Sequence, residues 1–331
     1  VWERLWIGGK VPYVLDKSLT KNHLKEFFKA IGEYHSRTCI RFVPRSSENV
    51  FVTIKYKRHV CGLAYGTTVE IGDACGGGPK SPLLIHELGH ILGYAHEQNR
   101  PDRDQWISGN GDAGIGPVMS GFETFGIMYD YVSIMHYEGQ CRSWKILKPG
   151  VTKCGGGNHL SVLDVDKFNA AYKCKGCHGY RWKNIKLLGR DDEVVNAGYD
   201  FDRTNFVPCR AFYYGDIIPG KGVLNAKVCY VAHGGKEHKI HSDFEVLTRN
   251  GADLRWDITP DLPAGSIAGG RTNERETYWV GRCFVSATVN GQKKWSLAIG
   301  KIYDSKRRNL IISLRGREMP CETEIEYLRC F

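Results

Sequence analysis

Hydrophobic positions in the first part of the chain follow a helical spacing and then a strand-like one. Leu19, Leu24, Phe27, Phe28 and Ile31 recur at helical intervals, which predicts an amphipathic helix. The segments that follow alternate apolar with polar residues or carry many β-branched ones, and we expect strands at 39–43, 51–56 and 66–71. We expect the last of these strands to form an edge of the sheet.

The second half of the chain is rich in predicted strands, and it repeats itself. The stretch Gly198–Arg210 has the same internal spacing as Gly270–Arg282. Gly220-Lys221 corresponds to Gly300-Lys301 after an eight-residue insertion around Trp295. Two such copies predict an all-β domain of two pseudo-symmetric units. The copies cover about 180–248 and about 253–331.

Residues 86–96 place three histidines and a glutamate at fixed intervals. His86 and His90 lie four residues apart, so on a helix they share one face and can hold one metal ion. Glu87 projects beside that ion, where it can take a proton from bound water. Gly93 tolerates positive φ, so the helix can stop there and the chain can bring His96 back as a third ligand. Three protein ligands with an open fourth position are typical of a catalytic zinc.

The short form of this motif, His-Glu-x-x-His, also occurs by chance in helices that bind no metal. Chance explains the longer form poorly, because it also requires the glycine and the third histidine at their offsets. The preceding run Pro82–Ile85 is apolar and is typical of a buried helix. The sequence therefore predicts one Zn²⁺ per chain, held by His86, His90 and His96.

Two further segments resemble the astacin metalloproteases, a family of metzincins. Residues 96–104 read His-Glu-Gln-Asn-Arg-Pro-Asp-Arg-Asp, and 129–137 end in Ser-Ile-Met-His-Tyr, as in the family's Met-turn. The resemblance covers the chain from about Trp6 to Cys174. It implies an α+β protease domain with a mixed sheet, an active-site helix and a Met-turn, in which Met135 lies beneath the zinc. Tyr137 would be an extra zinc ligand that swings away to stabilise the tetrahedral intermediate.

The resemblance also implies a mechanism and a set of disulfides. Zinc lowers the pKa of its bound water, and Glu87 would take the proton as the water attacks a peptide carbonyl. The edge strand would hold an extended protein or peptide substrate by backbone pairing. Two disulfides are implied, Cys39–Cys174 and Cys61–Cys75. We also expect Cys141–Cys154, for which nearness in sequence is the only reason.

Glu97 follows the third histidine, and the sequence leaves its partner open. In mature astacins the freed N-terminus pairs with the glutamate at this place. Counted back from Trp6, this chain begins about four residues too early for that reach. Either Val1 is not the mature end, or Glu97 has another partner.

Composition indicates the number of domains and the compartment. The chain has 331 residues, which favours two domains, and we place them at 1–176 and 177–331. Twelve cysteines without a repeating metal-ligand pattern indicate disulfides and a secreted, extracellular protein. The charged, tryptophan-rich start is typical of a mature form without a signal peptide. We expect no membrane span, because the chain lacks a run of about eighteen apolar residues.

The formal net charge of +10 raises the question of a nucleic-acid partner. Basic residues are spread along the chain, and the densest short run is Lys306-Arg307-Arg308. The chain contains no motif of the nucleic-acid-binding modules. We therefore expect a solvated basic surface with some attraction to acidic partners, and no nucleic-acid binding.

The repeats of the second half resemble the DM-nine family, some members of which bind mannose. The resemblance covers residues 178–331 and depends on Ala-Gly-x-Asp near 200, Pro-Gly-Lys near 221 and Gly-Lys-Glu near 237. It implies that Asp200 and Lys221 bind a mannose-type sugar. The carboxylate would accept hydrogen bonds from the sugar hydroxyls, and the ammonium would donate hydrogen bonds to their oxygens. The second copy keeps Lys301 but has Thr272 in place of the aspartate, so we expect its site to be weak or absent. The alternative is that Asp200 and Lys221 form only a surface salt bridge.

Two smaller features have simple interpretations. Cys174 and Cys177 could be half of a zinc ribbon, but no second pair lies at a suitable distance, so we expect each to belong to a different domain. His233, His238 and His241 are unevenly spaced in a polar segment, and we interpret them as surface residues rather than a metal site.

The sequence thus predicts a secreted zinc metalloendopeptidase with a C-terminal domain that binds mannose-type glycans. Two alternatives remain. The second domain could be a structural or dimerising unit beside the same protease. The chain could also be a lectin with an inactive protease, which is disfavoured because every catalytic residue is present.

Overall fold

A computed structural model describes residues 5–76, 78, 80–109, 116, 118–119, 121–137, 144–321 and 323–331. The chain divides into two compact units. The first unit ends at Cys174, and the second comprises Lys175–Phe331 together with the short segments Gly126–Met128 and Lys148–Thr152. The last passage of the chain from the first unit to the second lies between Cys174 and Lys175.

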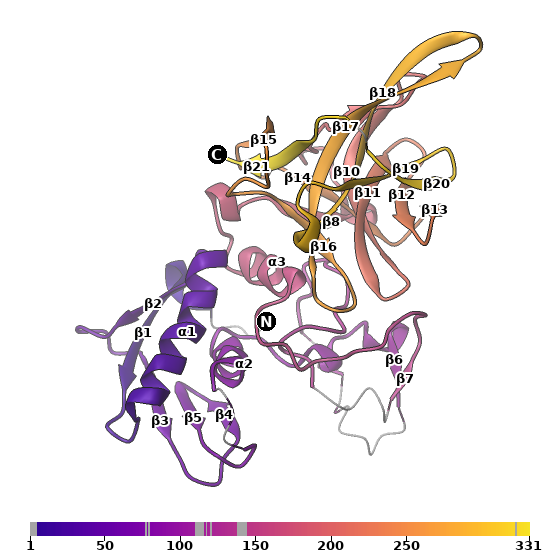
Figure 1. The fold of residues 1–331 in the computed structure, drawn as a ribbon. Coiled ribbons are helices and arrows are strands. Elements are labelled where there is room, and N and C mark those ends of the chain that lie inside the picture. Colours follow the sequence, from indigo (N-terminus) through magenta and orange to yellow (C-terminus); the bar gives the residue numbers. More distant parts are fainter. Residues whose placement is uncertain are drawn as a thin grey trace. The chain divides into compact units, whose positions relative to one another are not determined.

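The first half of the first unit contains a five-stranded mixed sheet and two helices (Figure 1). Its elements are η1 (Ile7–Gly9), β1 (Lys10–Leu15), α1 (Lys21–Arg37), β2 (Arg41–Pro44), β3 (Val52–Tyr56), β4 (Gly62–Tyr65), β5 (Thr68–Ile71) and α2 (Ser81–Ile91). The strand order is β2-β1-β3-β5-β4, and only β4 runs antiparallel to its neighbour. This sheet and the helices agree with the predicted α+β class.

The prediction that residues 66–71 form an edge of the sheet is wrong, because one more strand lies outside them. The strand β5 within 66–71 pairs with β3 on one side and with β4 on the other. The edge is β4, a short strand that the sequence analysis did not include. It follows the charged stretch 55–60 and holds only four residues, too few to show a clear alternation of apolar and polar positions.

The helix α1 forms where the apolar spacing predicted it. Its first turn is held by Thr20, whose hydroxyl accepts from the backbone N–H of His23, while the His23 ring accepts from the Thr20 N–H. Phe27, Ile31 and Tyr34 point into the core of this unit. The Tyr34 hydroxyl donates to the carbonyl of Ile85 at 2.7 Å, which ties α1 to the helix that carries the metal motif.

The rest of the first unit consists of short elements and one more helix. They are η2 (Glu97–Asn99), η3 (Arg103–Gln105), β6 (Ile107–Ser108), β7 (Lys145–Ile146) and α3 (Val162–Ala171). A capping box of Ser161 and Asp164 starts α3. The disulfides Cys39–Cys174 and Cys61–Cys75 are both present. The predicted Cys141–Cys154 bridge stays a prediction, because Cys141 lies outside the described residues.

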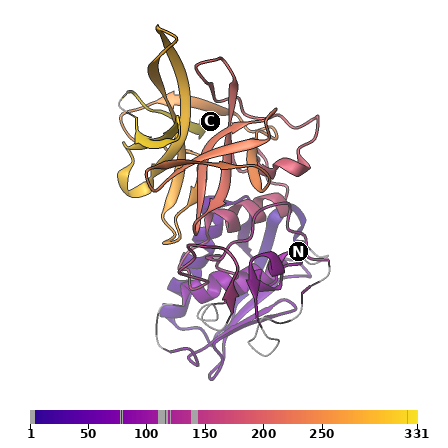
Figure 2. The ribbon, with the colours of Figure 1, turned by 90° about the vertical axis from the view of Figure 1, so that its right-hand side faces the viewer.

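The second unit is all-β apart from three single 3₁₀ turns, η5 (Gly176–His178), η6 (Ile185–Leu187) and η7 (Asp304–Lys306). Its strands are β8 (Arg181–Asn184), β9 (Gly198–Tyr199), β10 (Asn205–Tyr213), β11 (Asp216–Val223), β12 (Val228–His233), β13 (Lys236–Ile240), β14 (Phe244–Thr248), β15 (Leu254–Ile258), β16 (Ala268–Arg271), β17 (Thr277–Val289), β18 (Gln292–Tyr303), β19 (Leu310–Leu314), β20 (Arg317–Pro320) and β21 (Glu326–Cys330). All of them belong to one continuous, largely antiparallel network (Figure 2).

Strands from the two predicted repeats interleave in this network. The strand β9 pairs with β18 at Tyr199 and Leu297, and β16 pairs with β11 at Arg271 and Ile217. The N–H of Glu237 donates to the carbonyl of Gly316, and the N–H of Glu318 donates to that of Gly235. The two copies therefore share strand pairs, and one hydrophobic cluster contains residues of both, so they cannot be separated along the chain.

Three disulfides hold the second unit, and their pairing was not predictable from the sequence. They are Cys177–Cys330, Cys209–Cys229 and Cys283–Cys321. Since Cys174 pairs with Cys39 and Cys177 with Cys330, the half-zinc-ribbon alternative is wrong. None of the helices among the described residues has the length and apolar character needed to cross a membrane.

Candidate active site

The helix α2 carries the first three residues of the metal motif. It begins at Ser81, with Pro82 in the first turn, where a missing N–H costs nothing. It ends at Ile91, and Gly93 has a φ of 92°, which lets the chain reverse. The N–H of Tyr94 donates to the carbonyl of Gly89 in this reversal. The turn returns His96 toward the helix face that bears His86 and His90.

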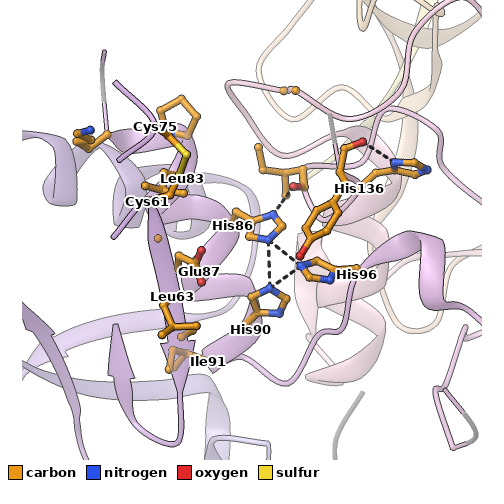
Figure 3. Close-up of a pocket in the computed structure, with 18 of the residues that line it drawn as sticks. Cys61, Leu63, Cys75, Leu83, His86, Glu87, His90, Ile91, His96 and His136 are labelled. Atoms are coloured by element: carbon orange, nitrogen blue, oxygen red, sulfur yellow. Dashed lines mark hydrogen bonds between the residues drawn. A yellow bond between two sulfur atoms is a disulfide. The ribbon is translucent and has the colours of Figure 1, made fainter. Parts of the chain in front are cut away.

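The three histidines direct their Nε2 atoms at one point (Figure 3). The Nε2 atoms of His86 and His90 lie 3.1 Å apart, and that of His96 lies 3.2 Å from His86 and 3.1 Å from His90. The Nδ1–H groups of His86 and His90 donate to the carbonyls of Ile134 and Tyr94, each at 2.7 Å. This fixes both tautomers, so the converging Nε2 atoms carry lone pairs. Three such lone pairs repel one another unless they share a cation, and three neutral imidazoles fit zinc.

Burial keeps these rings neutral, as metal ligation requires. Burial first, and then His90, lowers the pKa of His86 to about 4. Burial, followed by the other two rings, lowers the pKa of His96 to about 3. The pKa of His90 is lowered by burial as well. Among the described residues, no other group of three has the geometry of a metal site.

Glu87 lies beside this cluster, under the edge strand β4 (Figure 3). Burial raises its pKa to about 7, while a hydrogen bond from the backbone of Ala64 on β4 opposes the rise. A base whose pKa lies near neutrality can accept and return a proton at physiological pH. A Cβ atom on Gly62 would lie 2.6 Å from Glu87 Oε1 and 2.5 Å from Leu83, so the close approach of β4 requires glycine there.

Met135 packs directly beneath α2. A Cβ atom on Gly89 would lie only 2.4 Å from its sulfur, so the helix approaches the methionine as closely as glycine permits. The turn that holds Met135 is fixed by Asp164, whose carboxylate accepts from the hydroxyl of Ser133 and the N–H of Ile134. Asp164 was not singled out from the sequence, because an aspartate in the first turn of a helix is ordinarily interpreted as a cap.

Tyr137 stands at the opening of the site. Its side chain is 39% exposed, and its ring centroid lies 4.1 Å from that of His96 and 6.4 Å from that of His86. Its backbone N–H donates to the side chain of Gln98. Burial first, and then Glu87, raises the pKa of its hydroxyl, so the group is a proton donor at neutral pH.

The structure identifies the partners of Glu97, which the sequence analysis left open. Its Oε1 accepts from the ammonium of Lys167 at 2.6 Å, from the Asp130 N–H at 2.9 Å and from the Arg100 guanidinium at 3.2 Å. Glu97, Lys167 and Arg100 are all buried. The N–H of Glu97 donates to the carbonyl of Met135. This ion cluster therefore joins the segment that follows His96 to the turn beneath the helix.

The histidines open into a cleft of about 1030 Å³. One wall is the edge strand β4 with the Cys61–Cys75 disulfide, and the floor is α2. Tyr137 lies on the opposite side with Gly156 and Gly157. A cleft along a free strand edge can hold an extended chain.

The residues expected to bind sugar take different places in the second unit. The ammonium of Lys221 lies 3.0 Å from the carboxylate of Glu237, between the rings of Phe206 and Tyr230. The Asp200 carboxylate accepts from the next backbone N–H, that of Phe201. Lys221 therefore forms an ion pair with Glu237. The alternative from the sequence, a salt bridge between Lys221 and Asp200, named a different carboxylate.

The second copy has an equivalent ion pair, in which the lysine is less exposed but the glutamate is more exposed than in the first copy. Lys301 lies 3.0 Å from Glu318 and donates to the carbonyl of Ala232 at 2.6 Å. Its side chain is 1% exposed, compared with 6% for Lys221. Thr272 uses its hydroxyl to accept from the N–H of Glu276. The sequence analysis used Gly-Lys-Glu near 237 as part of the DM-nine resemblance and not as a site feature, and Gly316-Arg317-Glu318 follows Lys301 in the second copy.

The histidines of the second unit pack against aromatic residues. His238 stacks on Tyr213 with the ring centroids 4.1 Å apart, and its Nε2 donates to the carbonyl of His233. Burial lowers the pKa of His233. These contacts account for both rings without a metal.

Comparison with known proteins gives matches to both parts of the chain. The family model of the astacin peptidases matches residues 2–173, and that of the DM9 repeat matches residues 200–321. The chain is 34% identical over 194 residues to zinc metalloproteinase nas-14 of Caenorhabditis elegans, covering 52% of this chain and 38% of that protein. It is 36% identical over 184 residues to embryonic protein UVS.2 of Xenopus laevis, covering 50% and 35%. The chain thus spans well under two thirds of these relatives.

A solved structure is similar to the same half. It is high choriolytic enzyme 1, a hatching-enzyme zinc protease of the medaka fish Oryzias latipes, with 27% identity and a TM-score of 0.46. The match covers 53% of this chain and 98% of that one.

Proposed function

The chain belongs to the astacin family of peptidases, and on that premise we propose that it is a zinc-dependent endopeptidase that cleaves protein or peptide substrates. The convergence of three neutral Nε2 atoms within 3.2 Å of one another, with Glu87 beside them, carries the proposal. His86, His90 and His96 would hold one zinc ion. Bound zinc supplies Lewis acidity, which makes water nucleophilic near neutral pH.

The chain's own residues divide the proton and charge transfers between them. Glu87 takes a proton from the attacking water, which its raised pKa permits near neutrality, and passes it to the leaving amine. The Tyr137 hydroxyl, a donor at neutral pH, hydrogen-bonds the oxyanion that develops on the peptide carbonyl. The partial exposure of Tyr137 gives its side chain room to move toward that oxygen. Met135 supports the ligand helix from below, as a Met-turn would.

The substrate backbone would lie along β4. This strand ends the sheet order and borders the cleft, so its outer backbone groups can pair with an extended peptide. The backbone hydrogen bond from Ala64 to Glu87 would couple the position of the strand to that of the base. The short β4 thus takes the role that the sequence analysis gave to 66–71.

Substitution of the base tests this proposal. Glu87→Gln should lower cleavage of an unstructured protein by at least about a hundredfold, because a proton acceptor is lost while all three ligands remain. Zinc content, measured by atomic absorption, should stay near that of the wild type. Full activity in Glu87→Gln, or activity in the wild type that survives a chelator, would contradict the mechanism. The matched control is Glu33→Gln, a distant carboxylate on α1.

We also propose that the second unit binds a mannose-type glycan at one site per chain, through Asp200 and Lys221. Its support is the match to the DM9 repeat and the slightly greater exposure of the Lys221 side chain compared with that of Lys301. The sugar would compete with Glu237 for the ammonium, so the affinity should be low, roughly millimolar to micromolar. Useful binding would then need a dense glycan surface.

The competing role for this unit is structural or dimerising. Calorimetry of the full chain with mannose separates the two, because a structural unit gives no heat of binding. Asp200→Ala should abolish binding and leave peptide cleavage intact, whereas Thr272→Ala should change neither. Five disulfides among the described residues support the further proposal that the protein is secreted.

A further inference from the structure

The hairpin of β17 and β18 extends beyond the strands around it. Figures 1 and 2 both show it leaving the body of its unit. The two strands pair continuously from Tyr278–Tyr303 to Val289–Gln292. Their pairing with other described strands reaches only to Arg282 on β17 and to Leu297 on β18. The outer part of the hairpin is therefore a two-stranded ribbon, anchored near its base by the Cys283–Cys321 disulfide.

One face of this ribbon is packed, and the other is open. Val285, Ala287 and Val289 pack against the neighbouring hydrophobic core. The opposite face carries Phe284, which is 41% exposed, and Trp295, which is 45% exposed. They lie on the same face because Phe284 is opposite Leu297 and Ser286 is opposite Trp295, and side chains alternate along a strand. Packing in the core does not explain why two aromatic residues are exposed on a ribbon that makes no other strand pairs.

The open face is cationic as well as aromatic. The ammonium of Lys293 lies over the ring of Trp295, 4.9 Å from its centroid. Lys294 is opposite Ala287 and therefore lies on the packed face, so Lys293 is the lysine of the open face. No aspartate or glutamate occurs between Thr277 and Tyr303, so Lys293 has no acidic neighbour within the hairpin. An anionic surface would complement its charge.

The ribbon is poorly suited to pairing with a second copy of the chain. Its tip would bring Lys293 and Lys294 of two copies together, and lysines on an edge strand oppose such pairing. A tryptophan next to lysines is well suited to the boundary between water and lipid headgroups, where the ring is partly buried and the ammonium meets phosphate. The unpaired backbone edges would keep the ribbon at that boundary and out of the hydrocarbon.

The eight-residue insertion around Trp295, which lengthens this hairpin, is confined to the second copy. The corresponding hairpin of β10 and β11 closes at Tyr213 and Asp216, and its turn presents a single exposed aromatic residue, Tyr214. By the repeat spacing Phe284 corresponds to Phe212 of the first copy. The eight residues added around Trp295 therefore lengthen the ribbon and place Lys293 and Trp295 on the face that carries Phe284.

We propose that the outer face of the β17–β18 hairpin docks the protein on anionic lipid surfaces, with Phe284 and Trp295 at the interface and Lys293 against lipid phosphates. The role is independent of the catalytic site and of the proposed sugar site. Docking would hold the peptidase near substrates at a membrane surface without changing its chemistry.

Flotation of the full-length protein with vesicles tests the proposal. We expect binding to vesicles with about 30% phosphatidylserine, weak binding to pure phosphatidylcholine, and loss of binding at high salt. Trp295→Ala with Phe284→Ser should weaken binding on the order of tenfold. Lys293→Gln should weaken it roughly fivefold, whereas Lys294→Gln, on the packed face, should weaken it less. The matched control, Tyr214→Ala, should bind as the wild type does.

Cleavage of a free peptide and the unfolding temperature are the companion measurements. Both should remain near wild type in every variant, which shows that the chain is folded and active. Equal binding by the wild type and the aromatic double variant would overturn the proposal. So would capture by an immobilised sulfated polysaccharide without any vesicle binding, which would identify the face as a site for acidic glycans.

Discussion

The two units differ in whether their buried polar groups already have a partner of opposite charge. In the first unit three Nε2 atoms face one another within 3.2 Å, an arrangement that calls for a cation. In the second unit the buried ammonium groups of Lys221 and Lys301 already have their own carboxylates at 3.0 Å. A site whose donors converge without a partner should bind its ligand strongly. A site closed by an ion pair must open first, and should bind weakly.

Removing a metal ligand should have the largest effect. His96→Ala should lose zinc and lower peptide cleavage by several orders of magnitude, because two ligands cannot hold the ion in its catalytic geometry. Zinc analysis and a peptide assay check this. Mannose binding by the second unit should be unchanged in the same variant. A parallel loss in both units would show that they are not independent.

Removing the proposed oxyanion donor should cost less. Tyr137→Phe should lower kcat by about a hundredfold, with little change in KM, because the hydroxyl acts on charge that appears only in the transition state. Steady-state kinetics on a fluorogenic peptide separate the two constants. If only KM rose, Tyr137 would be a substrate-binding residue.

The ion cluster behind His96 should have an intermediate effect. Lys167→Met leaves Glu97 buried with less compensating charge, and we expect zinc affinity to fall about tenfold, as for loss of other groups that orient a ligand. Lys167→Arg should restore part of the loss. Competition with a chromophoric chelator measures the affinity. In the double variant Lys167→Met with Glu97→Gln, the loss should be smaller than the sum of the two single losses. Strict additivity would show that the pair does not act together.

The smallest effects should come from the second unit. Lys221→Ala should abolish a mannose affinity that is weak to begin with, whereas Lys301→Ala should leave it unchanged, because Lys301 is already closed off by Ala232 and Glu318. Calorimetry at high sugar concentration compares the two. If Lys301→Ala removed binding and Lys221→Ala did not, the assignment of the site to the first copy would be wrong.

The same contrast explains which parts the sequence could predict. The proposed metal ligands and base lie within 86–96, so local helical geometry brings them together and a motif predicts them. Lys167 could not be found in this way, because it contacts Glu97 across 70 positions of the chain. The edge strand β4 was missed because four residues carry too little pattern. Glu237 was seen in the repeat, but its contact with Lys221 depends on strand pairing that composition does not specify.

Metal removal and return test the central claim most directly. The wild-type protein would be stripped with a chelator, and zinc would be added back in steps while peptide cleavage and mannose binding are followed. We predict that cleavage falls to background, returns in proportion to added zinc and reaches its plateau at about one ion per chain, since the described residues form one three-histidine cluster. Mannose binding should stay constant throughout. Cleavage that persists in the zinc-free protein, or that does not return with zinc, would contradict the account.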